Sequence, residues 1–173
     1  MSANCLKLNM EKTEWLWTGS RSNLDQLPKS ALQLRLGNDT IDVADAVRVL
    51  GVLITPDLSR HVTAVSAKCY FQLRQLLRVR RSLDDESVAT LVHAFVTSRI
   101  DYCNGLLTGA PKVVTDKLQR VMNSAAPIIN NTWKFDHGLT HVRHDILHWF
   151  DVPERVTFKL CMTVYKCLLT YNF

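Results

Sequence analysis

The sequence predicts an α+β fold, with short strands in the first third of the chain and helices in the remainder. Three runs, at residues 14–19, 31–37 and 47–55, alternate in polarity or are rich in β-branched residues, and turn-forming residues bound them, which is typical of strands. Residues 20–30, between the first two runs, are predicted to form a loop. From Pro56 onward the apolar residues recur every three or four positions, which is the period of a helix.

Length and composition are those of a globular protein. The 173 residues suffice for a domain with a buried core, and 47% of them are hydrophobic while 21% are charged. The net charge of +5 favours a polyanionic partner, although solubility alone would also account for it. No apolar run approaches the roughly 18 residues that span a membrane, and the N-terminus lacks the apolar centre of a signal peptide. We therefore expect no membrane association and an intracellular location, in the nucleus or the cytoplasm.

A long amphipathic helix is expected over residues 58–83. Its basic residues crowd the C-terminal end, where they would contact nucleic-acid phosphates or form a solvated face that stabilises the helix dipole. The apolar stripe of this helix consists of Val62, Val65, Cys69, Leu73, Leu76 and Leu77, and its basic cluster consists of Lys68, Arg74, Arg78, Arg80 and Arg81.

Further helices follow after Ser82. Asp84 and Asp85 offer a cap and first-turn negative charge to the next helix, and Pro111 suits the first turn of the one after it. Pro127 is expected to end or kink that helix early. The apolar stripes of these two helices are Val88, Leu91, Val92, Phe95 and Val96, and Val114, Leu118, Val121, Met122 and Ala125. A short helix near 139–149 and a longer one at 153–169 complete the chain, the latter with the stripe Val156, Leu160, Val164 and Leu168.

No motif predicts catalysis. Asp84 and Asp85 could suggest a metal-binding acid pair, but they open a helix instead of following an aromatic residue on a β-hairpin, so capping is favoured. Four histidines, at 137, 141, 144 and 148, lie near Asp136 and Asp145, yet no third ligand falls at a usable spacing, and a polar surface is the favoured interpretation. The five cysteines form no C-x-x-C pair and are expected to be idle thiols. We predict no catalytic residue, metal site or cofactor.

Five blocks, in order, carry a family resemblance. They are KLNMEKTEW, VRVLGVLITPDLSRHV, SRIDYCNGLLTGAP, KLQRVMNSAA and DILHWFDVPERVTFKLCMTVYKCLL. Together they resemble the C-terminal half of the reverse transcriptase, an RNA-directed DNA polymerase, of non-LTR (LINE-like) retrotransposons, and they cover nearly the whole chain. The first and third blocks are the most specific. The resemblance implies that residues 1–55 are the end of the polymerase palm, 56–126 thumb-like helices and 127–173 a C-terminal helical segment.

The resemblance also implies which residues would contact nucleic acid. Lys12, in the K-T-E block, would occupy the palm position whose lysine approaches the leaving pyrophosphate. The thumb of such enzymes lies against the template–primer duplex, so the basic cluster of the long helix would reach its phosphates. Ile100 and Tyr102 of the third block are expected to pack, while Arg99 and Asp101 pair or cap. The expected nucleic-acid-binding residues are Lys12, Lys68, Arg74, Arg78, Arg80 and Arg81.

The departures from the family matter equally. The catalytic carboxylates of the family, including an aromatic-Ala-Asp-Asp hairpin, lie upstream of the matched blocks, and this chain has no such motif. Divalent metal ions are therefore implied for the intact family enzyme alone, and we expect no polymerase activity. Pro127, where a helix-compatible residue is expected, fits a decayed copy of the element.

Three hypotheses remain open on the sequence. The chain is a reverse transcriptase fragment that binds an RNA–DNA or DNA duplex without specificity, or a helical module that binds a protein partner through exposed apolar surface, or a functionless transposon relic that folds only in part.

Overall fold

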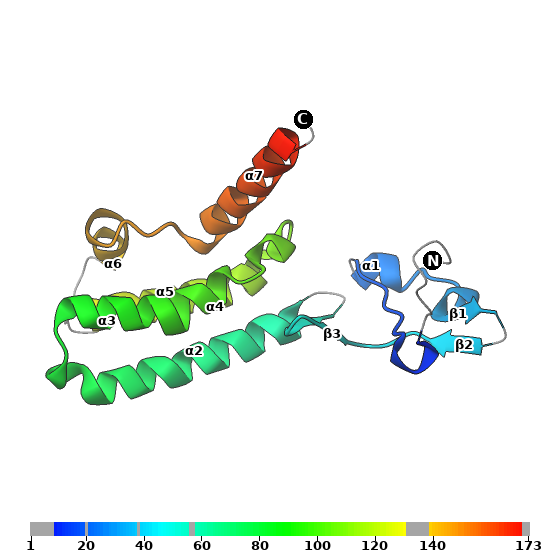
Figure 1. Ribbon diagram of the computed structural model, residues 1–173, viewed down its shortest axis with the longest axis horizontal. Helices are drawn as coiled ribbons and strands as arrows, with labels where there is room; N and C mark the ends of the chain where they lie inside the picture. The colour runs from blue at the N-terminus through cyan, green and yellow to red at the C-terminus, as the bar shows by residue number, and fades with distance from the viewer. Residues whose placement is uncertain (1–8, 20, 38, 56–57, 131–138, 171–173) are drawn as a thin grey trace. The chain divides into compact units, whose positions relative to one another are not determined.

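The structure is a computed structural model, and it describes residues 9–19, 21–37, 39–55, 58–130 and 139–170 (Figure 1). The chain divides into two compact units, Met1–His61 and Val62–Phe173. The first unit contains the strands and the second is helical, so the predicted α+β class is confirmed. The division between the units falls between His61 and Val62, and one helix spans residue 126.

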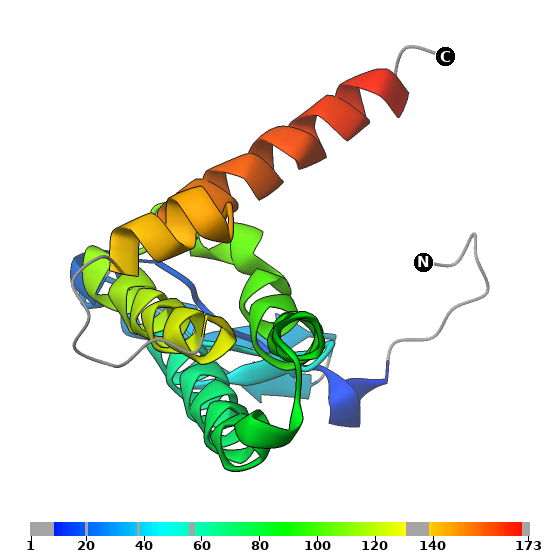
Figure 2. The same ribbon diagram turned by 90° about the vertical axis from the view of Figure 1, so that its left-hand side faces the viewer.

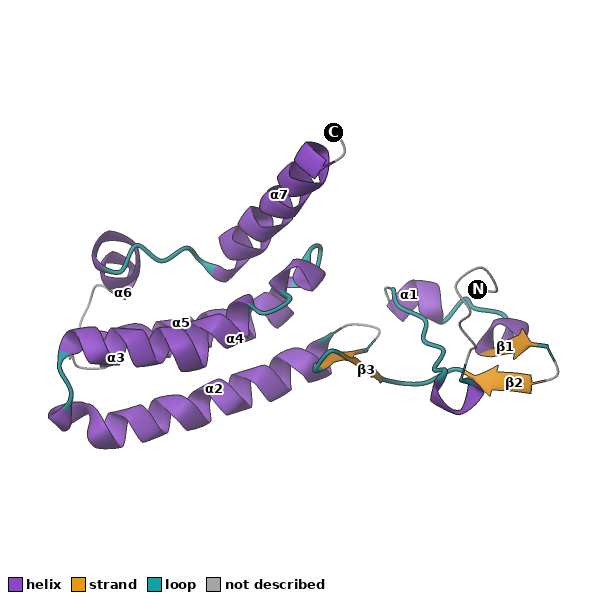
Figure 3. Cartoon of the chain, in the orientation of Figure 1, coloured by secondary structure: helices purple, strands orange, loops and turns teal. Residues whose placement is uncertain are grey.

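The first unit consists of two small antiparallel hairpins and several short helical turns (Figure 3). Strands β1 (Gln33–Leu36) and β2 (Asp39–Asp42) form one hairpin, with Leu34 opposite Ile41. The predicted strand at 14–19 is wrong, since only Trp15 makes an isolated bridge there, to Val43. The predicted loop at 20–30 contains helical turns. The turns of this unit are η2 (Met10–Lys12), α1 (Arg21–Leu24) and η3 (Lys29–Leu32).

The predicted single strand at 47–55 is instead a tight hairpin. Strands β3 (Val47–Val49) and β4 (Val52–Ile54) pair antiparallel around Leu50 and Gly51. These two residues have φ angles of 48° and 85°, and two consecutive positive φ angles are the signature of a type I′ turn. Gly51 adopts this conformation without strain, whereas Leu50 supplies a branched side chain that is 85% exposed.

The core of the second unit is a three-helix bundle, seen nearly end-on in Figure 2. The first helix is α2 (Ser59–Val79), followed by the turn η4 (Arg80–Ser82). The second begins as α3 (Asp85–Val92), passes through the π-helical turn η5 (His93–Thr97) and ends as α4 (Ser98–Asp101). The turn η6 (Asn104–Leu107) leads to the third helix, α5 (Lys112–Ile129). Lys117 contacts Thr63 and Arg80 contacts Ile129, so α2 and α5 run parallel.

Helical periodicity predicted the core of this bundle well. The stripe of α5 is buried throughout, and on the second helix Val88, Val92 and Val96 are completely buried. Leu77 and Phe95 depart from the prediction, at 55% and 39% exposed, because each lies at the edge of its stripe. Pro127 does not end α5, which continues two residues further to Ile129. A proline this close to the end removes one hydrogen bond without breaking the helix.

The chain ends with α6 (Leu139–His141), the π-helical turn η7 (Val142–Ile146) and the long helix α7 (Val152–Thr170). Figures 1 and 2 show α7 leaving the bundle at an angle. Only Val152 and Val156 of α7 are buried, so the stripe expected to pack along 156–168 is exposed from Leu160 onward. Among the described helices, none combines the length and apolar character needed to cross a membrane.

Candidate nucleic-acid interface

The solvent-facing side of α2 carries the largest part of the predicted basic cluster. This side lies opposite the buried stripe of Val62, Cys69 and Leu73, and Lys68, Arg74 and Arg78 are all exposed on it. Arg81 is exposed in the following turn. The side chains of Lys68, Phe71, Arg74 and Arg78 are called the α2 basic face below. Their separation is set by the rise of about 1.5 Å per residue along a helix, so the three cations are spread over about 15 Å.

Charge on α2 is of one sign. The 21 residues of the helix include four Lys or Arg side chains and neither Asp nor Glu. The exposed end of Arg78 makes one long contact within the helix, of 3.4 Å from its Nη1 to Oε1 of Gln75. A helix face that presents cations without neighbouring carboxylates attracts phosphates by a charge interaction that salt screens.

Arg80 departs from the sequence prediction, because its guanidinium is part of the fold. Nε donates to the carbonyl oxygen of Ile128 at 2.7 Å, and Nη2 donates to that of Ile129 at 3.0 Å. Nη1 donates to the carbonyl of Leu83 at 2.9 Å, and Nη2 also pairs with the carboxylate of Asp85. The side chain is 11% exposed. Arg80 therefore caps the C-terminal end of α5 and does not belong to the candidate interface.

Lys12 belongs to the first unit. It ends the short turn η2, where its backbone N–H donates to the carbonyl of Asn9 at 3.2 Å, and its side chain is exposed. The hydroxyl of Thr13 donates to the same carbonyl at 2.7 Å. The K-T-E block thus forms a local turn around Asn9. The structure brings Lys68, Arg74, Arg78 and Arg81 together along one helix and its end, and Lys12 belongs to the other unit.

The acid pair that opens α3 is structural. Asp84 occupies the N-cap position, and hydrogen bonding from the Ser87 side chain lowers the pKa of its carboxyl group. Asp85, in the first turn, pairs with Arg80. Asp84 and Asp85 thus lie at the start of α3 as predicted, although the side chain of Asp84 makes no N-cap hydrogen bond.

Metal-ligating groups are not assembled in the part of the chain that the structure describes. His141 pairs with Asp145 through a 2.6 Å contact, and His144 lies 3.7 Å from Asp151. No group of three or more His, Cys, Asp or Glu side chains there could hold a metal ion. His137 and Asp136 of the predicted cluster lie outside the described residues.

Cysteine chemistry is equally limited. Cys69 is fully buried against the second helix, and burial raises the pKa of its thiol to about 11. A thiol with so high a pKa stays protonated near neutral pH and is a weak nucleophile. Cys103, Cys161 and Cys167 are free and exposed, and Cys5 lies outside the described residues.

The SRIDYCNGLL string, which the sequence marked as a family signature, anchors α7 to the bundle. Ile100 is buried as predicted, whereas Tyr102 is 52% exposed. The carboxylate of Asp101 accepts a hydrogen bond from Arg155 at 2.8 Å instead of pairing with Arg99. Cys103 takes a left-handed conformation, φ 55°, which ends the helix and turns the chain. The string is therefore a turn that fixes the start of a helix 54 residues away.

A second set of contacts, not foreseen from the sequence, fixes the same end of α7. Oε1 of Gln119 accepts from the backbone N–H of Val152 at 2.8 Å, while its Nε2 donates to Asp151 at 3.1 Å. Asp151 also pairs with the nearly buried Arg143. The side chain of Glu154 accepts from the backbone N–H of Asp151 at 2.8 Å, which is the reciprocal half of a capping box. The D-x-x-E spacing at 151–154 was the one sequence signal for this cap.

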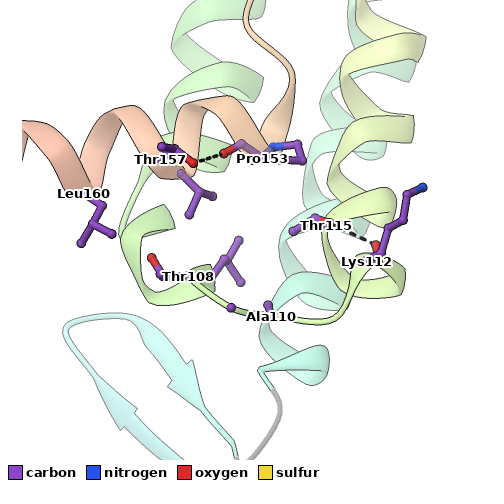
Figure 4. Close-up of a pocket in the computed structure, with 10 residues that line it drawn as sticks. Thr108, Ala110, Lys112, Thr115, Pro153, Thr157 and Leu160 are labelled. Atoms are coloured by element: carbon purple, nitrogen blue, oxygen red, sulfur yellow. Dashed lines mark hydrogen bonds between the residues drawn. The ribbon is translucent and has the colours of Figure 1, made fainter.

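A pocket of about 380 Å³ lies between the η6 turn, the start of α5 and the first turns of α7 (Figure 4). Three threonine hydroxyls at its wall are already used by local carbonyls, with distances of 2.7–3.1 Å. Lys112 extends away from the pocket and pairs with Asp116 at 3.1 Å. The remaining wall is apolar, and it includes Val156 and Leu160. The pocket therefore suits an apolar side chain better than a polar small molecule.

Comparison of the chain with protein-family models, with curated proteins and with solved structures finds no match in any of the three.

Proposed function

We propose that this chain is a fragment of a non-LTR retrotransposon reverse transcriptase that binds nucleic acid without sequence specificity and lacks polymerase activity. The observation that carries the binding is the α2 basic face, which presents exposed cations and no carboxylate. The resemblance of the five blocks supplies the identity of the partner, a template–primer duplex. Such a protein would act where that duplex is present, in the nucleus or the cytoplasm.

Binding of the purified chain to a labelled RNA–DNA hybrid, measured from 50 to 400 mM salt, tests this proposal. If four cations contact phosphates, the plot of log K against log salt should have a slope of about −3 to −4. The double variant Arg74→Ala with Arg78→Ala should reduce the slope by about 2. Lys112→Ala removes a cation from α5 that is 86% exposed, and it serves as the matched control that should leave the slope unchanged. A folded chain that shows no affinity at 50 mM salt would refute the proposal.

Primer extension is the corresponding test of the missing activity. The described residues assemble no group of three or more potential metal ligands, and the sequence lacks the family's acidic hairpin. We expect no extension of a primed RNA template with Mg²⁺ or Mn²⁺ present. Detectable extension that is lost in no-protein controls would overturn this part of the proposal.

A second candidate function rests on a different observation, the apolar side of α7. Seven large apolar side chains of this helix, from Phe158 to Leu169, are 37–61% exposed. Leu160, Val164 and Leu168 are spaced by four residues and so share one side of the helix, which continues the pocket wall to which Leu160 belongs. The cations Lys159 and Lys166 are also exposed along α7. This surface fits an amphipathic helix of another protein that carries acidic residues along its edge.

The two candidates respond differently to salt and to substitution. A synthetic Leu/Glu amphipathic helix should bind the α7 surface at high salt, and a Leu/Lys helix of the same pattern should bind more weakly. Val164→Glu with Leu168→Glu should abolish this binding, whereas Arg74→Ala with Arg78→Ala should not affect it. Equal binding of the two peptides, or self-association of the chain without them, would contradict this partner.

The relic hypothesis predicts that the chain does not fold cooperatively. Thermal unfolding followed by far-ultraviolet circular dichroism should show one sigmoidal transition if the second unit is a packed bundle, as its buried stripes indicate. A broad, non-cooperative melt would favour the relic.

A further inference from the structure

Phe71 lies in the middle of the α2 basic face, and its side chain is 51% exposed. It follows Lys68 by three residues and precedes Arg74 by three. With about 100° and 1.5 Å per residue, the ring lies about 60° around the helix from each cation and about 4.5 Å along the axis from each. Arg78, two turns further on, lies almost in line with Phe71. An aromatic ring is thus enclosed by cations on a face that bears no acid.

Exposure alone would say little, because Leu77 and Val79 of the same region are equally exposed. Their positions differ from that of Phe71. Leu77 lies about 120° around the helix from Phe71 and belongs to the edge of the buried stripe, where partial burial is expected. Phe71 lies on the side of the helix opposite the core, so packing within this unit does not account for an aromatic residue there.

Cations that alternate with an exposed aromatic ring are the arrangement that single-stranded nucleic acid recognises. The phosphates bind the cations, and an unpaired base stacks on the ring with a contribution of about 1–3 kcal/mol per base. A duplex can use the same cations, but its bases are stacked on one another and cannot reach the ring unless a step is opened. The Phe71 ring therefore favours a single strand over a duplex, although both ligands offer the same phosphates to the cations.

We propose that the α2 basic face binds a single strand of DNA or RNA, with phosphates on Lys68 and Arg74 and one unpaired base stacked on Phe71. This inference rests on the proposed nucleic-acid binding and deepens it, since it names the strand state that the face prefers. The preferred ligand is an unpaired stretch, such as the overhang of a template beside its duplex.

Fluorescence anisotropy with three probes of equal length tests the inference: a dT15 strand, an abasic strand with the same phosphates, and a DNA duplex. Phe71→Ala should weaken binding of dT15 by about 5- to 160-fold, which corresponds to one stacked base. It should change binding of the abasic strand and of the duplex by less than about twofold. Phe71→Trp should bind dT15 at least as tightly as the unmodified chain. Leu77→Ala, which removes an equally exposed apolar side chain outside the face, is the matched control and should change nothing.

Phe71→Leu separates stacking from apolar contact, because it keeps bulk and loses the ring. It should lose most of the affinity for dT15 that Phe71→Ala loses. Equal losses on all three probes would mean that the ring supports the helix or inserts into a duplex, and either result overturns the inference. Binding that needs Arg74 and Arg78 but ignores Phe71 would also overturn it while leaving the proposed function intact. Failure of the unmodified chain to bind any probe would refute both.

Discussion

Arg80→Ala is expected to lower the free energy of unfolding by about 2–4 kcal/mol. The guanidinium donates to the carbonyls of Leu83, Ile128 and Ile129 and pairs with Asp85. A hydrogen bond from a charged donor contributes about 1.5–3 kcal/mol, so three of them give an upper limit of about 4.5–9 kcal/mol. These carbonyls lie at the end of a helix, where water can replace part of the lost bonding once the side chain is gone. The net loss of unfolding free energy in Arg80→Ala should therefore be about half of this upper limit.

Thermal unfolding of Arg80→Ala and Arg81→Ala side by side measures this effect. For a chain of this length, 2–4 kcal/mol corresponds to a fall in Tm of about 5–15 °C. Arg81 is its exposed neighbour, so Arg81→Ala should change stability by less than about 0.5 kcal/mol. Binding of the RNA–DNA hybrid, measured well below Tm, should be weakened more by Arg81→Ala than by Arg80→Ala, because of the two residues only Arg81 belongs to the proposed interface. Equal Tm values for the two variants would refute the assignment of Arg80 to the fold.

Three further predictions concern the second unit. Met122→Ala should lower the free energy of unfolding by about 2–5 kcal/mol in a urea titration, since the side chain is 1% exposed and would leave a cavity. Iodoacetamide at pH 8 should modify Cys103 and spare Cys69 until urea is added, because burial raises the pKa of Cys69 to about 11; peptide mass mapping would show both. A double-mutant cycle of Asp101→Asn and Arg155→Ala should give a coupling of about 1–2 kcal/mol, and a coupling near zero would contradict the anchoring role of this pair.

The helices could be predicted from the sequence because their apolar residues follow the helical period over many turns. All five stripe residues predicted for α5 are buried, and α2 ends close to the expected place. The hairpin at 47–54 could not be predicted in the same way. Its turn, Leu50-Gly51, uses a positive φ at a leucine, and neither periodicity nor the usual Asn-Gly signal marks such a turn.

The roles of the individual arginines could not be predicted from the sequence. Arg78, Arg80 and Arg81 look equivalent in the string RVRRS, yet only Arg80 reaches carbonyls about 48 residues away in the chain. That difference depends on tertiary packing, which places the end of α5 beside Arg80. The exposed stripe of α7 was missed for a related reason: an amphipathic pattern predicts a helix with an apolar side, but whether that side is covered depends on what packs against it.

The residues that hold the second unit together are separate from those proposed to bind nucleic acid. Arg80 and the Asp101–Arg155 pair connect distant segments of the unit through buried or half-buried contacts. Phe71 and Arg74 face away from the core and close no tertiary contact of this kind in the described structure. Substitutions on the α2 basic face should therefore change binding without changing stability, and substitutions in the anchoring contacts should do the opposite. This separation allows a loss of binding to be distinguished from a loss of fold.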